Sequence, residues 1–142
     1  MINTGVQEDH TLTRAGEDYL ESIYRLSLED PSGDKSVRSV DVAEQLNVSK
    51  ASVNKALSML KETGMVVQSR YGRVTLTERG ERYAALVWRA HRTLRTFLES
   101  DLGVDPQLAD EEACLMEHVL SEQTTERFVA YLEKQGISVP EE

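Results

Sequence analysis

The stretch SVDVAEQLNVSKASVNKALSML, residues 39–60, decides the fold. Its apolar residues recur at three- and four-residue steps on both sides of a short break at residues 47–48, which predicts two amphipathic helices. Ser39 and Ser49 are suited to cap the starts of these helices. Gly64 is suited to end the second helix in a left-handed conformation. Two helices joined by so short a turn are typical of a helix-turn-helix motif.

A basic hairpin is predicted directly after the second helix. Residues 65–69 and 74–77 are either consecutive apolar residues or alternate between apolar and polar residues, which favours two short strands. Residues 70–73 between them read Arg-Tyr-Gly-Arg and would form a basic turn. A helix-turn-helix followed by such a hairpin indicates a winged helix-turn-helix, the first part of a mainly α-helical chain.

Four further helices are expected from apolar periodicity. They cover residues 11–28, with Thr11 or Thr13 as the cap, and residues 77–100, 107–120 and 123–135. The helix over residues 77–100 is longer than a winged domain needs and has a broad apolar face. A face of this kind usually pairs with a second copy of the same chain, so we expect a homodimer.

Composition and charge narrow the class of protein. The 142 residues carry a net charge of −9, but residues 49–95 hold ten basic and only three acidic side chains, which is the asymmetry of a nucleic-acid-binding segment. No long apolar run and no secretion signal is present, so no membrane location is expected. The single cysteine, Cys114, fits a reducing cytoplasm.

The predicted DNA contacts follow from the motif. The N-terminal part of the second helix enters the major groove, where Asn pairs with adenine, Lys reaches guanine or phosphate, and an Ala methyl touches thymine. The predicted reading residues are Ser49, Lys50, Ala51, Ser52, Asn54 and Lys55 on the helix, with Arg70 and Arg73 on the wing. An ordinary solvated basic face is the alternative interpretation.

Potential metal ligands cluster near the C-terminus. Cys114, Glu117 and His118 have i, i+3, i+4 spacing and would share one face of a helix. A thiolate, a carboxylate and an imidazole suit a first-row transition metal rather than a structural zinc finger. Asp18 and Glu21 are also three residues apart, and His91 could complete a second site. A buried structural cysteine, a solvated Glu–His pair or a Cys114–His118 catalytic pair are the alternatives.

The chain resembles the diphtheria-toxin-repressor and manganese-transport-regulator family of metal-dependent repressors. The resemblance rests on five stretches: EDYLESIY at residues 17–24, VAEQLNVS at 42–49, LTERG at 76–80, AHR at 90–92 and EACLMEHVLS at 112–121. The last stretch is the most specific of the five, and together the five span nearly the whole chain.

The resemblance implies two domains. A winged helix-turn-helix domain would cover residues 1–77, and an all-helical dimerisation and metal-binding domain residues 78–142, with no SH3-like third domain. The positions that match the family's ligands are Asp18, Glu21, His91, Cys114, Glu117 and His118.

The ligand set is a hybrid of two branches of the family. Asp18 and Glu21 resemble the manganese branch, whereas Cys114 resembles the iron branch. Arg95 and Asp110 stand where the iron branch has a Glu and a His in its ancillary site, so a second site of that form is not implied.

The resemblance implies a repressor of metal-uptake genes rather than an enzyme, with no organic cofactor. Mn²⁺ or Fe²⁺ would bind between the DNA-binding and dimerisation domains, with Zn²⁺, Co²⁺ or Ni²⁺ as substitutes in vitro. The metal would activate binding to a double-stranded, palindromic operator. Two alternatives stay open: a winged-helix regulator with a small organic effector, and a thiol enzyme or redox sensor that uses Cys114.

Overall fold

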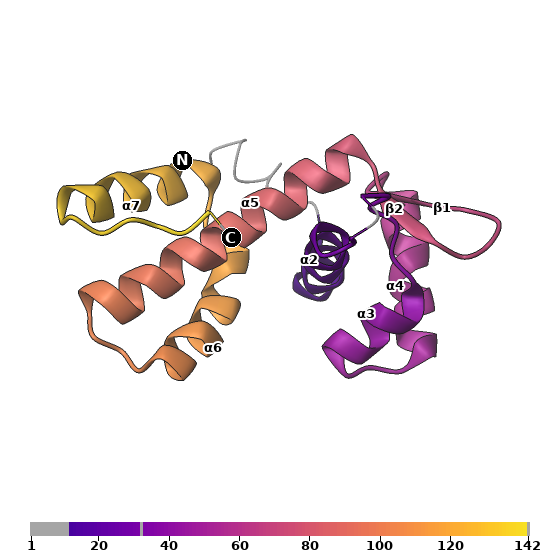
Figure 1. Ribbon diagram of the computed structural model, residues 1–142, viewed down its shortest axis with the longest axis horizontal. Helices are drawn as coiled ribbons and strands as arrows, with labels where there is room; N and C mark the ends of the chain where they lie inside the picture. Colours follow the sequence, from indigo (N-terminus) through magenta and orange to yellow (C-terminus); the bar gives the residue numbers. More distant parts are fainter. Residues whose placement is uncertain (1–11, 32, 142) are drawn as a thin grey trace. The chain divides into compact units, whose positions relative to one another are not determined.

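The computed structural model describes residues 12–31 and 33–141. Its elements in chain order are α2 (Arg14–Leu28), α3 (Ser39–Leu46), α4 (Lys50–Glu62), β1 (Val66–Gln68), β2 (Val74–Leu76), α5 (Glu78–Thr96), η1 (Phe97–Asp101), α6 (Pro106–Met116), η2 (Glu117–Val119) and α7 (Glu122–Lys134). Two compact units form, one from residues 12–85 and the other from the described residues after 85. The long helix α5 belongs to both units (Figure 1).

The first unit is a winged helix-turn-helix, as the sequence predicts. Helices α2, α3 and α4 contact one another, and β1 pairs antiparallel with β2, with Val66 opposite Leu76. Backbone hydrogen bonds of 2.8 Å in both directions join Val37 to Val74 and extend the wing by one bridge. The core of this unit consists of fully buried apolar side chains, among them Leu20, Ile23, Val42, Val53, Leu60 and Met65.

The helix ends of this unit agree with the predicted caps in three cases out of four. Oγ of Ser49 accepts from the backbone N–H of Ser52, and Gly64 has φ +75°. Thr13 caps α2, while Thr11 lies outside the described residues. The prediction that Ser39 caps α3 is wrong, because Ser39 is the first helical residue and Arg38 holds the cap position without a side-chain cap bond.

The start of α5 packs directly on the segment that follows α4. Oγ1 of Thr77 donates to the carbonyl of Gly64 at 2.6 Å and accepts from the N–H of Gly80 at 3.0 Å. A Cβ atom at residue 80 would lie 2.0 Å from the carbonyl oxygen of Met65. Only glycine fits so close an approach of helix to backbone.

The second unit is all-helical. After Thr96 the predicted helix over residues 77–100 widens into the π-helical turn η1, and α6 and α7 contact this turn. Phe97 lies edge-on against Phe128, with ring centroids 5.2 Å apart. Leu94, Leu98, Ala109, Ala113 and Leu132 are buried here. In the described part of the chain, every helix is too short or too polar to cross a membrane.

Candidate metal centre and DNA interface

His91 is the centre of the polar cluster in the second unit. It lies on α5 and is only 2% exposed. Its Nδ1 atom lies 2.9 Å from Oε1 of Glu117, and its Nε2 atom lies 2.9 Å from Oδ1 of Asp110. Both ring nitrogens of one buried imidazole therefore face carboxylates that come from a different part of the chain.

Cys114 adds a sulfur donor to this cluster. Its Sγ atom lies 3.7 Å from Nδ1 of His91, and its side chain is exposed. One donor atom each from His91, Asp110 and Cys114 lies within 4.8 Å of the others. Nδ1 of His91, Oε1 of Glu117 and Sγ of Cys114 are nitrogen, oxygen and sulfur donors that suit a first-row transition metal, so the residues present fit the metal that the sequence predicts.

The prediction of one continuous helical face for the C-terminal ligands is wrong in part. The predicted helix over residues 107–120 ends at Met116, and Glu117–Val119 form a 3₁₀ turn. Because a 3₁₀ turn has three residues per turn rather than 3.6, it rotates the side chains that follow it relative to an α-helix. Glu117 is 2% and His118 9% exposed, whereas Cys114 is exposed. Oε1 of Glu117 lies 2.9 Å from Nδ1 of His91.

Asp18 and Glu21 lie on α2 in the winged-helix unit, so four of the six predicted ligands lie in the second unit. The Asp18 side chain is exposed, and Glu21 is only 8% exposed. Their neighbour Glu17, which the prediction leaves out, is buried and accepts a 2.6 Å hydrogen bond from the hydroxyl of Tyr83. Glu17 therefore has a structural contact inside the winged-helix unit.

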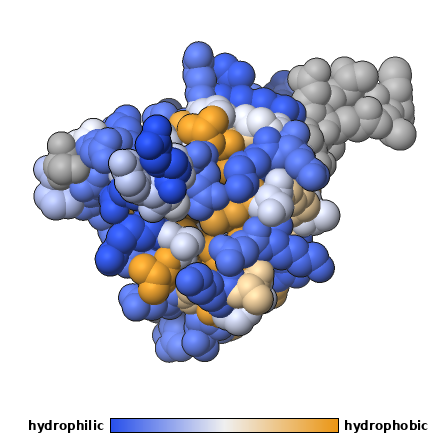
Figure 2. Space-filling model, turned by 90° about the vertical axis from the view of Figure 1, so that its right-hand side faces the viewer, coloured by the Kyte–Doolittle hydropathy of each residue, from blue (hydrophilic) through white to orange (hydrophobic). Residues whose placement is uncertain are grey.

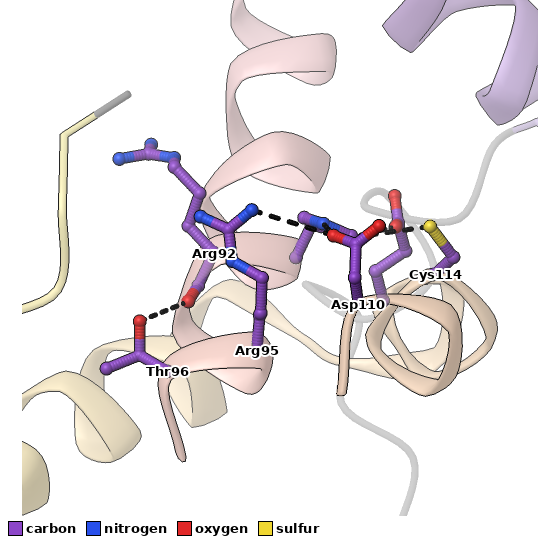
Figure 3. Close-up of polar contacts among 7 residues, drawn as sticks. Arg92, Arg95, Thr96, Asp110 and Cys114 are labelled. Atoms are coloured by element: carbon purple, nitrogen blue, oxygen red, sulfur yellow. Dashed lines mark hydrogen bonds and ion pairs between the residues drawn. The ribbon is translucent and has the colours of Figure 1, made fainter. Parts of the chain in front are cut away.

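Asp110 is the residue of this cluster that the predicted ligand set omits. It precedes Cys114 by four residues on α6, a spacing that places both on the same side of a helix. Nη1 of Arg95 lies 3.6 Å from Oδ1 of Asp110. Figure 3 shows that Arg95 and Asp110 point toward each other, while Arg92, on the preceding turn, points away from Asp110.

An aromatic ring lies flat against His91. The ring of Trp88, one turn earlier on α5, has its centroid 5.0 Å from that of His91, with an angle of 8° between the planes. The guanidinium of Arg92 lies 6.0 Å from the Trp88 ring centroid. Stacking on one face and carboxylates at both nitrogens restrict how the His91 ring can turn.

The predicted reading residues lie on the exposed side of α4. Val53, Ala56 and Leu57 lie on the opposite face of this helix and are buried. By contrast, every predicted DNA contact on this helix is exposed: Ser49, Lys50, Ala51, Ser52, Asn54 and Lys55. An exposed, capped helix start with short side chains is what approach to base edges requires.

The two wing arginines have different surroundings. Arg70 is exposed, and its guanidinium lies 5.9 Å from the ring centroid of Tyr71, which is 83% exposed. Arg73 donates from Nε to Oγ of Ser36 at 2.6 Å and from Nη2 to the Ser36 carbonyl at 3.1 Å. Arg73 therefore ties the wing to the segment before α3, a role that the sequence prediction did not include.

A groove of about 420 Å³ joins the wing to the starts of both motif helices. Its basic lining residues are Arg38, Lys50 and Arg73. The guanidinium of Arg38 donates two hydrogen bonds to the carboxylate of Asp41, at 3.0 and 2.9 Å. This hydrogen bonding raises the pKa of Arg38. The side of the molecule that carries the wing is mostly hydrophilic, with apolar residues between the polar ones (Figure 2).

Comparisons with known proteins match both units. Residues 11–74 match the family model "Iron dependent repressor, N-terminal DNA binding domain", and residues 77–136 match "Iron dependent repressor, metal binding and dimerisation domain". An HTH-type transcriptional regulator of Methanocaldococcus jannaschii is 34% identical over 87% of this chain and 96% of its own length. The transcriptional regulator MntR of Salmonella typhimurium is 34% identical over 86% of this chain and 74% of its own length.

A solved structure of a manganese-dependent transcriptional repressor in complex with manganese superposes with a TM-score of 0.71. The two sequences are 34% identical, and the match covers 83% of this chain and 52% of that one. This chain thus spans about half the length of that repressor.

The fold and the polar cluster define a winged-helix DNA-binding regulator with a helical metal-binding unit. The chain belongs to the iron-dependent repressor family, which includes metal-dependent repressors and has an N-terminal DNA-binding domain and a C-terminal metal-binding and dimerisation domain. Members of this family regulate transcription and are not enzymes. The predicted fold class and the predicted class of function are confirmed.

Proposed function

We propose that this protein represses metal-uptake genes and binds its operator as a homodimer when Mn²⁺ or Fe²⁺ is present. The observation that carries this proposal is the cluster of nitrogen, oxygen and sulfur donors around buried His91, in a chain that also presents a capped, exposed recognition helix. Because the regulator acts on chromosomal DNA, we place it in the cytoplasm.

The proposed ligands are Asp18, Glu21, His91, Cys114, Glu117 and His118. The divalent ion, when bound, supplies positive charge to a cluster rich in carboxylates. Glu117 and His91 are buried and already 2.9 Å apart, so their donor atoms need little reorganisation. The thiol of Cys114 adds a soft donor, and the carboxylates of Asp18 and Glu21 would add hard donors, a combination that fits Fe²⁺ as well as Mn²⁺.

The proposed domains are residues 1–77 for DNA binding and residues 78–142 for dimerisation and metal binding. The two family matches, which end at residue 74 and begin at residue 77, support this division. Ligands from both domains would link metal occupancy to the state of the DNA-binding domain. Metal and DNA would then raise each other's affinity, since thermodynamic linkage is reciprocal.

The proposed DNA contacts are Ser49, Lys50, Ala51, Ser52, Asn54 and Lys55 in the major groove, with Arg70 and Arg73 at the wing. The exposure of all six helix residues supports the first set. A homodimer presents two such helices, so the operator would be a palindrome.

The test is DNA binding to the protein's own promoter region, measured in chelator and after addition of Mn²⁺, Fe²⁺ under anaerobic conditions, or Zn²⁺. We expect binding only with metal, and its loss in Glu117→Ala. Glu133→Ala, an exposed carboxylate on α7, is the matched control and should bind as the wild type does. Equal binding in chelator and in metal would refute the metal switch and favour a regulator with an organic effector.

A further inference from the structure

Asp110 and Arg95 share one contact beside His91. Oδ1 of Asp110 lies 2.9 Å from Nε2 of His91, and the same oxygen lies 3.6 Å from Nη1 of Arg95. Figure 3 shows the guanidinium approaching Asp110 from α5 while the carboxylate extends from α6. One carboxylate oxygen thus joins an imidazole to a permanent cation.

The two nitrogens of His91 face different chemical surroundings. Nδ1 faces Oε1 of Glu117 at 2.9 Å and Sγ of Cys114 at 3.7 Å, both of which are proposed metal ligands. Nε2 faces Asp110. A histidine that binds a metal through one nitrogen almost always donates its other N–H to a carboxylate, a carbonyl or water, and this contact fixes the ring. Asp110 has the position of that carboxylate.

Arg95 makes the Nε2 side unsuitable for a metal ion. A guanidinium keeps its positive charge and has no acceptor atom, so it cannot serve as a ligand. At 3.6 Å from Oδ1 of Asp110 it attracts the carboxylate and repels a divalent ion that approaches the same oxygen. The side chains of Arg95 and Asp110 are 28% and 51% exposed, and ion pairs this exposed contribute little to stability.

We propose that Asp110, held by Arg95, is a positioning residue that directs Nδ1 of His91 toward the metal, and that Arg95 excludes a further ion from the Nε2 side. This inference rests on the proposed function, because it requires a metal at His91. It adds two residues to the centre and gives each a role other than ligation.

The first test is nitrogen-15 NMR of the Zn²⁺-loaded protein, since Zn²⁺ is diamagnetic. His91 is assigned by its absence from the spectrum of His91→Gln. We expect a metal-bound Nδ1 and a protonated Nε2 at His91. A metal-bound Nε2 would overturn the proposal.

The second test counts Mn²⁺ ions per chain by electron paramagnetic resonance of the free ion. Asp110→Asn should keep the wild-type count but weaken binding by about 10- to 100-fold, as loss of an outer-shell partner does. If Asp110→Asn instead loses an ion, Asp110 is itself a ligand and the proposal is wrong.

Arg95→Glu should bind one ion more than the wild type, because a carboxylate replaces the repelling cation beside Asp110 and His91. The matched control is Arg89→Glu, which makes the same charge change on the same helix at an ion pair of 3.9 Å with Glu126. The control should gain no ion. Equal counts in Arg95→Glu and the wild type would refute exclusion by Arg95, whereas a wild type that binds no metal would refute the proposed function as well.

Discussion

The hydroxyl of Tyr83 donates a 2.6 Å hydrogen bond to Oε2 of Glu17 and accepts a 3.2 Å hydrogen bond from the N–H of Leu12. All three residues are buried, so this contact joins the start of α5 to α2 inside the winged-helix unit. A hydrogen bond to a charged group contributes about 1.5–3 kcal/mol to stability.

Tyr83→Phe should therefore lower the free energy of unfolding by about 1.5–3 kcal/mol, because it removes a buried hydrogen bond to a carboxylate. Urea denaturation followed by circular dichroism measures the change. Tyr71→Phe is the control, since Tyr71 is 83% exposed on the wing, and its stability should match the wild type. A Tyr83→Phe variant as stable as the wild type would show that the contact is not stabilising.

Gly80→Ala should destabilise the winged-helix unit by about 1–3 kcal/mol or more, as overpacking does. The new Cβ would lie 2.0 Å from the backbone oxygen of Met65, which cannot move without shifting the end of α4. Gly16→Ala is a useful comparison, because the nearest atom there is the flexible end of the Met59 side chain, at 3.1 Å. We expect thermal unfolding to fall clearly for Gly80→Ala and to change less for Gly16→Ala. Similar midpoints for both variants would contradict the close packing at Gly80.

Trp88 should report metal binding, because it is the only tryptophan in the chain and its ring stacks on His91. Addition of Co²⁺ should quench its fluorescence in a saturable way, and His91→Gln should greatly weaken the response. Equilibrium dialysis on the same samples gives the bound metal independently. Bound metal without any change in emission would place the ion away from His91.

Asn54→Ala and Lys50→Ala should weaken DNA binding in different ways. Asn54→Ala removes a bidentate contact to a base, so it should weaken binding by about 1–3 kcal/mol and relax the sequence preference at one position. Lys50→Ala removes a phosphate contact, so it should weaken binding to all sequences. It should also reduce the slope of the logarithm of the binding constant against the logarithm of the salt concentration by about 0.9. Fluorescence anisotropy over a range of KCl concentrations distinguishes the two. Lys61→Ala is the control, because Nζ of Lys61 donates to Gln68 at 2.8 Å near the other end of α4.

Much of the winged-helix unit could be predicted from sequence because its signals are local. The cap at Ser49 and the left-handed Gly64 depend on residues within a few positions of each other. The error at Ser39 has a local cause as well. The guanidinium of Arg38 binds Asp41, and the helix starts at Ser39 without a side-chain cap.

The metal centre was harder to predict because its contacts are long-range. Asp110 lies 19 residues from His91 in sequence, and spacing on α6 alone gives no reason to pair them. The change from α6 to the 3₁₀ turn at Glu117 is also invisible to apolar periodicity, although the buried ligands Glu117 and His118 lie in this turn. The assignment of Asp18 and Glu21 as ligands stays a prediction.

The hydrogen bonds between Arg73 and Ser36 have a consequence for the rate of DNA binding and for the conformational entropy that is lost on binding. Together with the Val37–Val74 bridge, they fix the wing against the body of its unit when the protein folds. The conformational entropy of the hairpin is then lost during folding rather than during association, which favours affinity. Binding should therefore proceed without an ordering step at the wing, and a wing released by Arg73→Ala would have to lose that entropy on the DNA.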